Sequence, residues 1–229
     1  DHMLKMSGII DVIIPRGGRS LVDKVQSDAR VPVFSHLEGI CHIYVDEFAN
    51  FEKSVSVVVN GKMRRTGICG ATESLLINNK IAKSFLPIIF SDLKASGCEV
   101  VGDKKSKSII SEMALAKEED WSTEYLGPKI SIKIVDDIFD AIKHIEKFGS
   151  QHTDAIMTEK KANADIFTKS VDSAIVMVNA STQFADGGEF GLGAEIGIST
   201  GRLHARGPVG AEQLTSFKYV VHGNGQIRA

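Results

Sequence analysis

The sequence predicts an α/β fold built on a largely parallel sheet in three layers. Short runs of β-branched and apolar residues alternate with amphipathic helical patterns along most of the chain. Glycine, proline or a capping residue stands at many of the boundaries between them. Because parallel neighbours need a crossover connection, which is usually a helix, this alternation favours parallel strands covered by helices.

The first strand is expected at Ile9–Ile14, an apolar run that ends at Pro15. Arg16-Gly17-Gly18 then predicts a turn before a helix through Leu21, Val22 and Val25; it suits an anion-binding helix start, but also a plain turn. The next elements, in order, are strands at Val31–Phe34 and Ile43–Val45, a helix at Phe51–Met63 after Asn50, a strand at Glu73–Ile77, a helix at Ile81–Leu93 before Gly97, and a strand at Cys98–Val101.

The second half of the chain continues the alternation and then changes character. The expected elements are a strand at Ile130–Val135, a helix at Ile138–Phe148, a strand at Ala155–Thr158, a helix at Ala162–Ser170 and a strand at Ala174–Val178. Residues 186–210 hold eight glycines without a hydrophobic period, which predicts a long, ordered functional loop. A final strand at Lys218–Val221 is expected to pair at a subunit edge, which suggests an oligomer.

Composition limits the classes of partner. The 229 residues carry 27 lysines and arginines against 29 acidic residues, a net charge of −2, which gives no bulk attraction to nucleic acid or an anionic membrane. A small-molecule partner is therefore favoured. No apolar run is long enough to span a bilayer and no secretory signal is recognisable, so a cytoplasmic protein is expected. Residues 1–3 are expected to be the remnant of a cleaved tag.

Cys69 is the candidate nucleophile among three cysteines that suggest neither disulfides nor zinc. It lies between Gly67 and Gly70, and two upstream arginines, Arg64 and Arg65, could stabilise a thiolate or hold an anionic substrate. Composition alone favours a buried structural cysteine instead, so both interpretations stay open at this point.

The other two cysteines are expected to be structural, and the histidines are not expected to bind a metal. Cys41 and Cys98 lie in or at apolar strands, which is typical of structural cysteines. The histidines are dispersed without H-x-x-x-H spacing, so no metal centre is predicted and most are expected at the surface or in loops.

Several segments together resemble γ-glutamyl phosphate reductase (glutamate-5-semialdehyde dehydrogenase), a branch of the aldehyde dehydrogenase superfamily. The matching stretches are Asp11 to Gly18, His36 to Gly39, the segment around Cys69, Thr123 to Leu126, and above all the run from Val178 to Gly210 with Asp186-Gly187-Gly188-Glu189-Phe190-Gly191. The resemblance implies NADPH-dependent reduction of γ-glutamyl phosphate to glutamate 5-semialdehyde with release of phosphate, a step of proline biosynthesis. It also implies an aldehyde dehydrogenase-type catalytic domain, and glutamate 5-kinase as a possible pathway partner.

The resemblance assigns roles to individual residues. It implies that Cys69 is the catalytic thiol, which attacks the acyl phosphate and forms a thioester that hydride then reduces. The coenzyme-side positions it implies are Gly17, Gly18, His36 and Glu124, where His36 stands in place of the general-base glutamate of hydrolytic aldehyde dehydrogenases. The substrate-side positions it implies are Arg65, Ser181, Glu189 and Phe190.

The family also implies a division of the chain. Residues 4–48 are expected to be the last part of an NADP-binding domain, residues 49–210 the catalytic thiol domain, and residues 211–229 an oligomerisation segment. With so little of the coenzyme domain, the isolated chain is expected to bind NADPH weakly or not at all and to have little activity. The exposed edge at Ile9–Ile14 predicts an intertwined or strand-swapped homodimer.

Three positions depart from the family pattern, which usually has asparagine, proline and asparagine where Ile40, Thr66 and Gly70 stand. They motivate an alternative, a non-catalytic remnant or interaction module that keeps the catalytic fold. Gly127-Pro128 is more typical of general aldehyde dehydrogenases and leaves another aldehyde specificity as a third, minor alternative.

Overall fold

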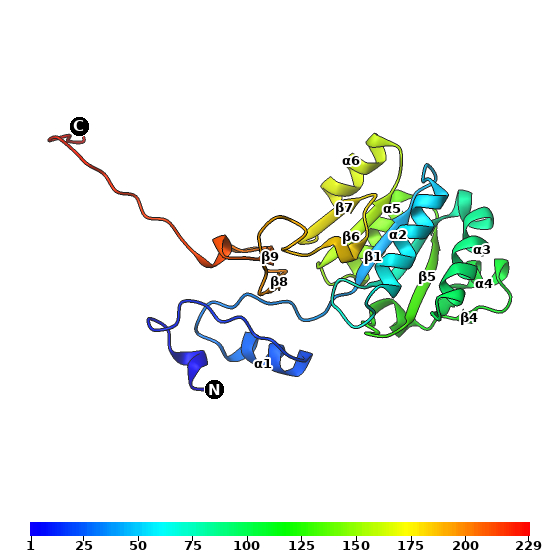
Figure 1. Cartoon of the computed structure of the whole chain (residues 1–229), viewed down its shortest axis with the longest axis horizontal. Helices are drawn as coiled ribbons and strands as arrows, with labels where there is room; N and C mark the ends of the chain where they lie inside the picture. Colours follow the sequence, from blue (N-terminus) through cyan, green and yellow to red (C-terminus); the bar gives the residue numbers. More distant parts are fainter.

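The computed structural model describes all 229 residues and confirms the predicted α/β class. Seven strands form one all-parallel sheet in the order β4-β3-β5-β2-β1-β6-β7. The strands are β1 (Cys41–Val45), β2 (Thr72–Asn78), β3 (Glu99–Gly102), β4 (Ala114–Leu115), β5 (Lys129–Val135), β6 (Thr153–Met157) and β7 (Ile175–Val178). Figure 1 shows the sheet between two layers of helices.

The helices follow the strands, as right-handed crossovers require. The α-helices are α1 (Arg19–Asp28), α2 (Phe51–Met63), α3 (Asn79–Ala95), α4 (Lys104–Ile109), α5 (Ile138–Phe148) and α6 (Lys161–Ser170), and short 3₁₀ turns lie at η1 (Met3–Lys5), η2 (Glu118–Ser122), η3 (Thr182–Phe184) and η4 (Glu212–Leu214). None of them combines the length and the apolar character that crossing a membrane demands.

Two apolar cores hold the three layers together. The larger packs α2 and α3 on one face of the sheet, with Phe85, Leu75 and Ile132 fully buried. The smaller packs α5 and α6 on the opposite face around Tyr44 and Phe167. The central strands β1, β2 and β6 are buried along their entire length, because helices cover both faces. This rigid centre fixes the positions of the loops that leave its edges.

Three predicted strands are wrong, and all three lie outside the seven-stranded sheet. Ile9–Ile14 and Val31–Phe34 meet only through the isolated bridge Ile13–Val33, because neither segment has a second neighbour from which a ladder could grow. Lys218–Val221 forms no strand within the chain, and Figure 1 shows this tail leading away from the domain. Its side chains find no partner strand within a single chain.

The glycine-rich run holds more structure than predicted. Within residues 186–210 the chain forms an antiparallel hairpin of β8 (Gly197–Ser199) and β9 (Gly207–Val209). The hairpin contacts the segment before β1, where Thr200 N–H donates to the carbonyl of Ser35 at 3.2 Å. The predicted loop is therefore ordered, and it brings its residues back toward the sheet.

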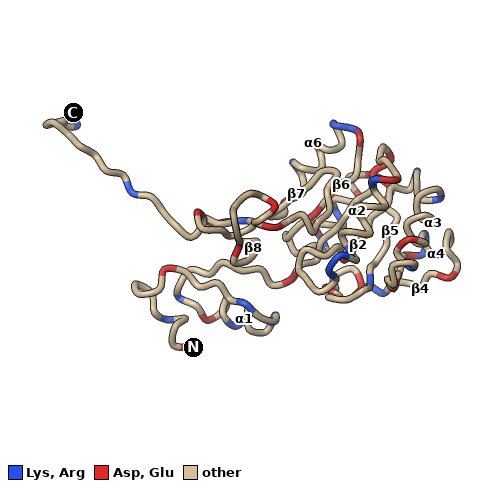
Figure 2. The backbone as a smooth tube through the Cα atoms, viewed as in Figure 1, with Lys and Arg blue, Asp and Glu red and all other residues tan.

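Charged residues of both signs are spread over the domain surface, as Figure 2 shows. Lysine–carboxylate pairs such as Lys53–Glu159 and Lys80–Glu47 lie at its exterior. Neither sign predominates along the traced chain, in keeping with the net charge of −2.

Candidate active site

The candidate site lies at the amino-terminal edge of three neighbouring strands. Cys69 precedes β2, His36 precedes β1, and His152 directly precedes β6. Because β2, β1 and β6 are adjacent and parallel, the segments that enter them meet at one edge. The register agrees, since Cys41 lies opposite Thr72.

The backbone of Cys69 is tightly held from one side. A Cβ atom at Gly39 would lie 2.0 Å from the carbonyl oxygen of Cys69, so only glycine allows this approach. The Cys41 thiol donates to the same carbonyl at 3.1 Å. Cys41 is fully buried, as predicted for a structural cysteine, and here it positions the loop that carries the half-buried Cys69.

The charges around the thiol favour its protonated form. Burial, together with the carboxylates of Glu124 and Glu195, raises the pKa of Cys69 to about 11, while Arg16 acts in the opposite direction. The carboxyl end of α2, which points toward this edge, adds no stabilisation for an anion. The surroundings of Cys69 therefore do not stabilise a thiolate in the resting site. For Cys69 to act as a nucleophile, a neighbouring base has to take the thiol proton.

Arg64 and Arg65 do not lie where the sequence suggested a cation for the thiol. Both are exposed, and neither is among the charges that act on Cys69. The carbonyl of Arg65 accepts a hydrogen bond from Gln183 Nε2 at 3.1 Å, so its backbone helps to shape the loop. The cation that does act is Arg16, from the predicted turn before α1.

Two histidines lie beside the thiol, which sequence spacing did not predict. One ring nitrogen each of His36 and His152 and the sulfur of Cys69 lie within 4.8 Å of one another. The two rings meet edge to face, with centroids 4.8 Å apart. Most of the seven histidines lie at the surface or in loops, as expected, but His42, His144 and His152 are buried.

Glu124 joins the site through the glycine loop. Its Oε1 accepts a hydrogen bond from Gly39 N–H at 2.8 Å, and no hydrogen bond within the chain occupies Oε2. The half-buried carboxylate therefore faces the thiol segment with one oxygen free for a ligand. This arrangement suits a donor hydroxyl such as that of a ribose.

The other predicted coenzyme-side residues lie at a separate place. Gly18 is the N-cap of α1, and Gly17 precedes it, outside the contacts that surround Cys69. Arg16 connects the two places, because its guanidinium donates to the carbonyl of Ile196 next to β8. Their role in coenzyme binding stays a prediction.

The predicted substrate-side residues divide into two groups. Ser181 caps η3, and η3 packs on the thiol turn, where a Cβ at Gly70 would lie 3.4 Å from the carbonyl of Thr182. Glu189 and Phe190 lie in the turn that Asp186 caps, and they are not brought to the thiol. Substrate contact by these residues likewise remains a prediction.

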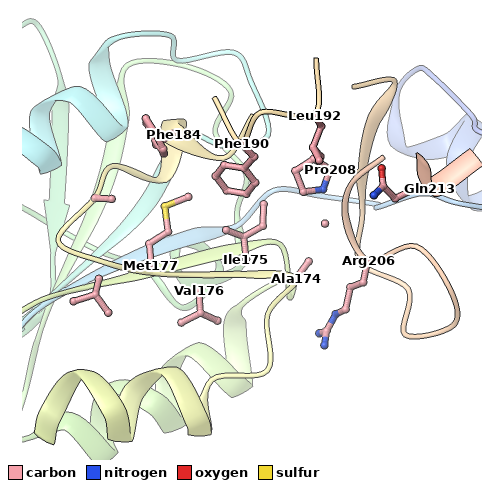
Figure 3. Close-up of a pocket in the computed structure, with 13 residues that line it drawn as sticks. Ala174, Ile175, Val176, Met177, Phe184, Phe190, Leu192, Arg206, Pro208 and Gln213 are labelled. Atoms are coloured by element: carbon pink, nitrogen blue, oxygen red, sulfur yellow. The ribbon is translucent and has the colours of Figure 1, made fainter. Parts of the chain in front are cut away.

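Phe190 instead lines an apolar cavity of about 570 Å³ beside the edge strand β7. Figure 3 shows its ring above Ile175 and Met177, with Pro208 and Arg206 on the side of β9. This cavity holds neither Cys69 nor its charged neighbours. The candidate active site is therefore the edge of the sheet that carries Cys69, because the reactive groups lie there and not in the apolar cavity beside β7.

Glu195 and His152 are residues that sequence reasoning did not assign. Glu195 Oε2 accepts from Gly187 N–H at 3.0 Å, and burial raises the pKa of its carboxyl group. A weak signal existed for His152. It stands a few residues before the predicted strand Ala155–Thr158, and the start of every parallel strand shares one edge with the segment that carries Cys69.

Comparison with known proteins places this site in context. The chain is 58% identical over 228 residues to a γ-glutamyl phosphate reductase of Hyphomonas neptunium and 56% identical over 228 residues to that of Mesorhizobium japonicum. These alignments cover 99% of the chain but 53% of each relative, so the chain spans about half the length of the relatives it matches. No protein-family model matches the chain.

Solved structures give the same result. The crystal structure of γ-glutamyl phosphate reductase from Thermotoga maritima superposes with a TM-score of 0.97 at 47% identity, over 100% of this chain and 55% of that one. An acetylating aldehyde dehydrogenase from Geobacillus thermoglucosidasius shares the fold, with a TM-score of 0.75 at 20% identity over 99% of this chain and 59% of its own. The aldehyde dehydrogenase-type architecture is thus confirmed.

Proposed function

We propose, since this chain belongs to the γ-glutamyl phosphate reductase family, that Cys69 is the nucleophile of an acyl-phosphate reduction. The substrate is γ-glutamyl phosphate, and the products are glutamate 5-semialdehyde and phosphate, within proline biosynthesis. The observation that carries the proposal is the half-buried thiol, held by its backbone against Gly39 and Cys41, at an edge where two imidazoles and two carboxylates converge.

The first half-reaction needs only residues of this chain. The Cys69 thiol passes its proton to a neighbouring imidazole or carboxylate, and its sulfur then attacks the acyl carbon of the substrate. The bond from that carbon to the phosphate oxygen breaks, phosphate leaves, and a thioester on Cys69 remains. Sulfur suits both halves of the reaction because it is a strong nucleophile and a good leaving group.

The second half-reaction reduces the thioester. NADPH, when bound, supplies the hydride that the carbonyl carbon accepts. The resulting tetrahedral alkoxide on Cys69 re-forms the carbonyl as the carbon–sulfur bond breaks. This frees the aldehyde, and the Cys69 thiolate takes back the proton that it gave up in the first half-reaction. Glu124 fits a role in holding the coenzyme ribose, because its Oε2 is free and its Oε1 is fixed by Gly39. Gly17, Gly18 and His36 complete the proposed coenzyme side.

His36 fits reduction better than hydrolysis of the thioester. Its Nδ1 lies 2.7 Å from the carbonyl of Ile198, and only a protonated Nδ1 can donate to that oxygen. Where a hydrolytic enzyme needs a carboxylate to activate water, this site thus offers an imidazole tied to β8. On the substrate side we propose Ser181, with Arg65, Glu189 and Phe190 as further contacts.

Turnover tests the proposal. The chain is mixed with NADP⁺, phosphate and glutamate 5-semialdehyde, alone and with the nucleotide-binding segment of a full-length relative, and NADPH formation is followed. Before β1, residues 4–40 form only α1, a 3₁₀ turn and a few bridged segments, so we expect weak or no coenzyme binding by the chain alone and activity in the mixture. Activity that survives Cys69→Ser in the mixture would exclude the proposed nucleophile.

One observation favours the alternative of a non-catalytic module. The raised pKa of Cys69 leaves the thiol protonated at neutral pH, as in an inert buried cysteine. Competitive alkylation of the three cysteines by iodoacetamide at neutral pH distinguishes an active site from a non-catalytic module. An active site predicts that Cys69 reacts at least about tenfold faster than the buried Cys41 and Cys98; equal, slow labelling of all three favours the module.

We further propose that the tail forms a homodimer. Phe217, Tyr219 and Val221 are more than four-fifths exposed, at 82%, 87% and 87%, and β7 presents an unpaired edge beside the apolar cavity. The tail of a second copy can add a strand to that edge. Residues 211–229 are then the oligomerisation segment, and residues 49–210 are the catalytic domain. Glutamate 5-kinase, as the source of the acyl phosphate, is the proposed pathway partner in the cytoplasm.

A further inference from the structure

The strongest unassigned feature is the donor set formed by His36, Cys69 and His152. One thiol sulfur and two imidazole nitrogens lie within 4.8 Å of one another, on three segments that the sheet holds in place. Thiolate with imidazole is a donor set that Zn²⁺ prefers, with a fourth position left open. We propose that this cluster binds Zn²⁺ or a similar thiophilic divalent cation and thereby reversibly masks the Cys69 thiol.

The buried histidine has a nitrogen without a partner. His152 is 0% exposed, and its Nε2 makes no hydrogen bond. Its Nδ1 lies 2.9 Å from the hydroxyl of Thr153 and 3.6 Å from the Cys41 sulfur. A buried, unsatisfied nitrogen costs folding free energy, which a coordinated cation would recover.

Both histidines have their Nδ1 atom engaged, as is common for metal ligands. His36 Nδ1–H donates to the carbonyl of Ile198 at 2.7 Å, and His152 Nδ1–H can donate to the hydroxyl of Thr153. Such hydrogen bonds fix the tautomer and direct the Nε2 lone pair outward. Each ring therefore keeps the lone pair of Nε2 free for coordination.

The surrounding charge also favours a cation. Glu124 and Glu195 act on the thiol as negative charges, and Arg16 opposes them. A divalent cation would offset these carboxylates and stabilise Cys69 as thiolate, which burial otherwise disfavours. Ligand atoms around a tetrahedral zinc are roughly 3.5 Å apart, so closure requires a shift of about 1 Å. The half-buried His36, on a loop before β1, can supply this shift.

Cobalt spectroscopy tests the ligand set. Co²⁺ is titrated into the metal-free chain, and we expect one equivalent to give a thiolate-to-cobalt charge-transfer band with tetrahedral d–d bands. Cys69→Ser is expected to remove the charge-transfer band. In competition with a chromophoric chelator, His36→Gln and His152→Gln are each expected to weaken Zn²⁺ binding at least about tenfold.

Matched controls separate this site from adventitious binding. Cys98→Ser removes a buried thiol elsewhere, and His222→Gln removes an imidazole of the exposed tail, so neither should change the affinity. If the buried His152→Gln variant does not fold, His36→Gln carries the test alone. Equal Zn²⁺ affinity for the unmodified chain and Cys69→Ser, or cobalt binding without a charge-transfer band, would overturn the proposal.

Alkylation provides a readout that does not depend on catalysis. Bound Zn²⁺ is expected to slow iodoacetamide labelling of Cys69 at least about tenfold, and a chelator is expected to restore it. In the His36→Gln variant the same Zn²⁺ concentration should protect Cys69 from alkylation much less. Because the metal site does not require the reduction reaction, it can be present even if the thioester never forms, and the two proposals fail separately.

Discussion

At the scale of single residues, the site depends on a close approach that only glycine permits. A Cβ at Gly39 would meet the carbonyl of Cys69 at 2.0 Å, and backbone atoms cannot rotate away as a side chain can. Gly39→Ala is therefore expected to lower the free energy of unfolding by about 1–3 kcal/mol and to misplace the thiol. Denaturation and the alkylation rate of Cys69 measure the two effects.

Gly67→Ala is the matched control for this substitution. Its Cβ would lie 3.9 Å from the nearest atom, the carbonyl oxygen of Leu126, which is ordinary contact. We expect stability and labelling close to those of the unmodified chain. Equal effects of the two alanines would show that the close approach at Gly39 does not position the thiol.

The buried His144 makes stability depend on pH. Burial lowers its pKa to about 2, with His42 and Lys133 acting in the same direction, so the folded ring stays neutral where the unfolded ring takes up a proton below pH 6.5. Unfolding is therefore favoured as the pH falls through this window, by up to about 1.4 kcal/mol per pH unit from this group.

His144→Gln should flatten that dependence. Urea denaturation from pH 6.5 to about pH 5 is expected to show a smaller loss of unfolding free energy in the variant than in the unmodified chain. His222→Gln, in the exposed tail, should leave the slope unchanged. Parallel slopes for His144→Gln and the unmodified chain would contradict a neutral buried ring.

The sequence predicted the thiol but only part of its surroundings. Cys69 could be found because glycines flank it and because its segment resembles a known family. His152 could not be found by motif spacing, since its distance from Cys69 along the chain carries no periodic signal. It becomes visible only when β1, β2 and β6 are known to be adjacent and parallel.

At the scale of elements, a buried ion pair fastens α2 to β2. Lys62 Nζ lies 2.5 Å from Glu73 Oε2, and both side chains are at most 1% exposed. Burial raises the pKa of Glu73 to about 7, although Lys62 acts to lower it. Because Glu73 Oε1 has no hydrogen-bond partner, the carboxylate relies on the lysine for its stabilisation.

Replacing one residue of the Lys62–Glu73 pair should lower the free energy of unfolding more than replacing both. Lys62→Met is expected to lower the free energy of unfolding by about 3–5 kcal/mol, because it leaves a buried carboxyl group unpaired. Adding Glu73→Gln should recover part of this loss. The exposed pair Lys53–Glu159 is the control, where Lys53→Met should cost less than about 1 kcal/mol. Urea denaturation of the unmodified chain, the two single variants and the double variant measures the coupling between Lys62 and Glu73. Strictly additive losses of unfolding free energy would show that the two side chains do not interact.

Element prediction succeeded where local chemistry was unambiguous. The helix at Phe51–Met63 is confirmed at both ends, and the side chain of Asn50 accepts from Lys53 N–H as a cap should. Prediction failed at Ile9–Ile14, where an apolar run lacks neighbours, and at the hairpin of β8 and β9, where glycines conceal the period of two. Whether a segment forms a strand depends on the neighbouring strand with which it can pair, as well as on its own sequence.

At the scale of the whole molecule, the tail is an unsatisfied apolar surface. Residues 213–229 carry only two charged side chains, Lys218 and Arg228, and Figure 1 shows the C-terminal end of the chain leading away from the domain. Light scattering is expected to show a dimer for the chain and a monomer after removal of residues 215–229. A monodisperse monomer of the unshortened chain at working concentration would contradict the proposed pairing.

The central claim, that Cys69 accepts an acyl group from an acyl phosphate, is tested most directly by mass spectrometry of the protein. The chain is incubated without coenzyme with γ-glutamyl phosphate generated in place by a kinase, quenched in acid and digested. We expect one glutamyl thioester, confined to the peptide of Cys69, sensitive to hydroxylamine and absent from Cys69→Ser. No acylation of Cys69, or equal acylation of Cys41 and Cys98, would contradict the account.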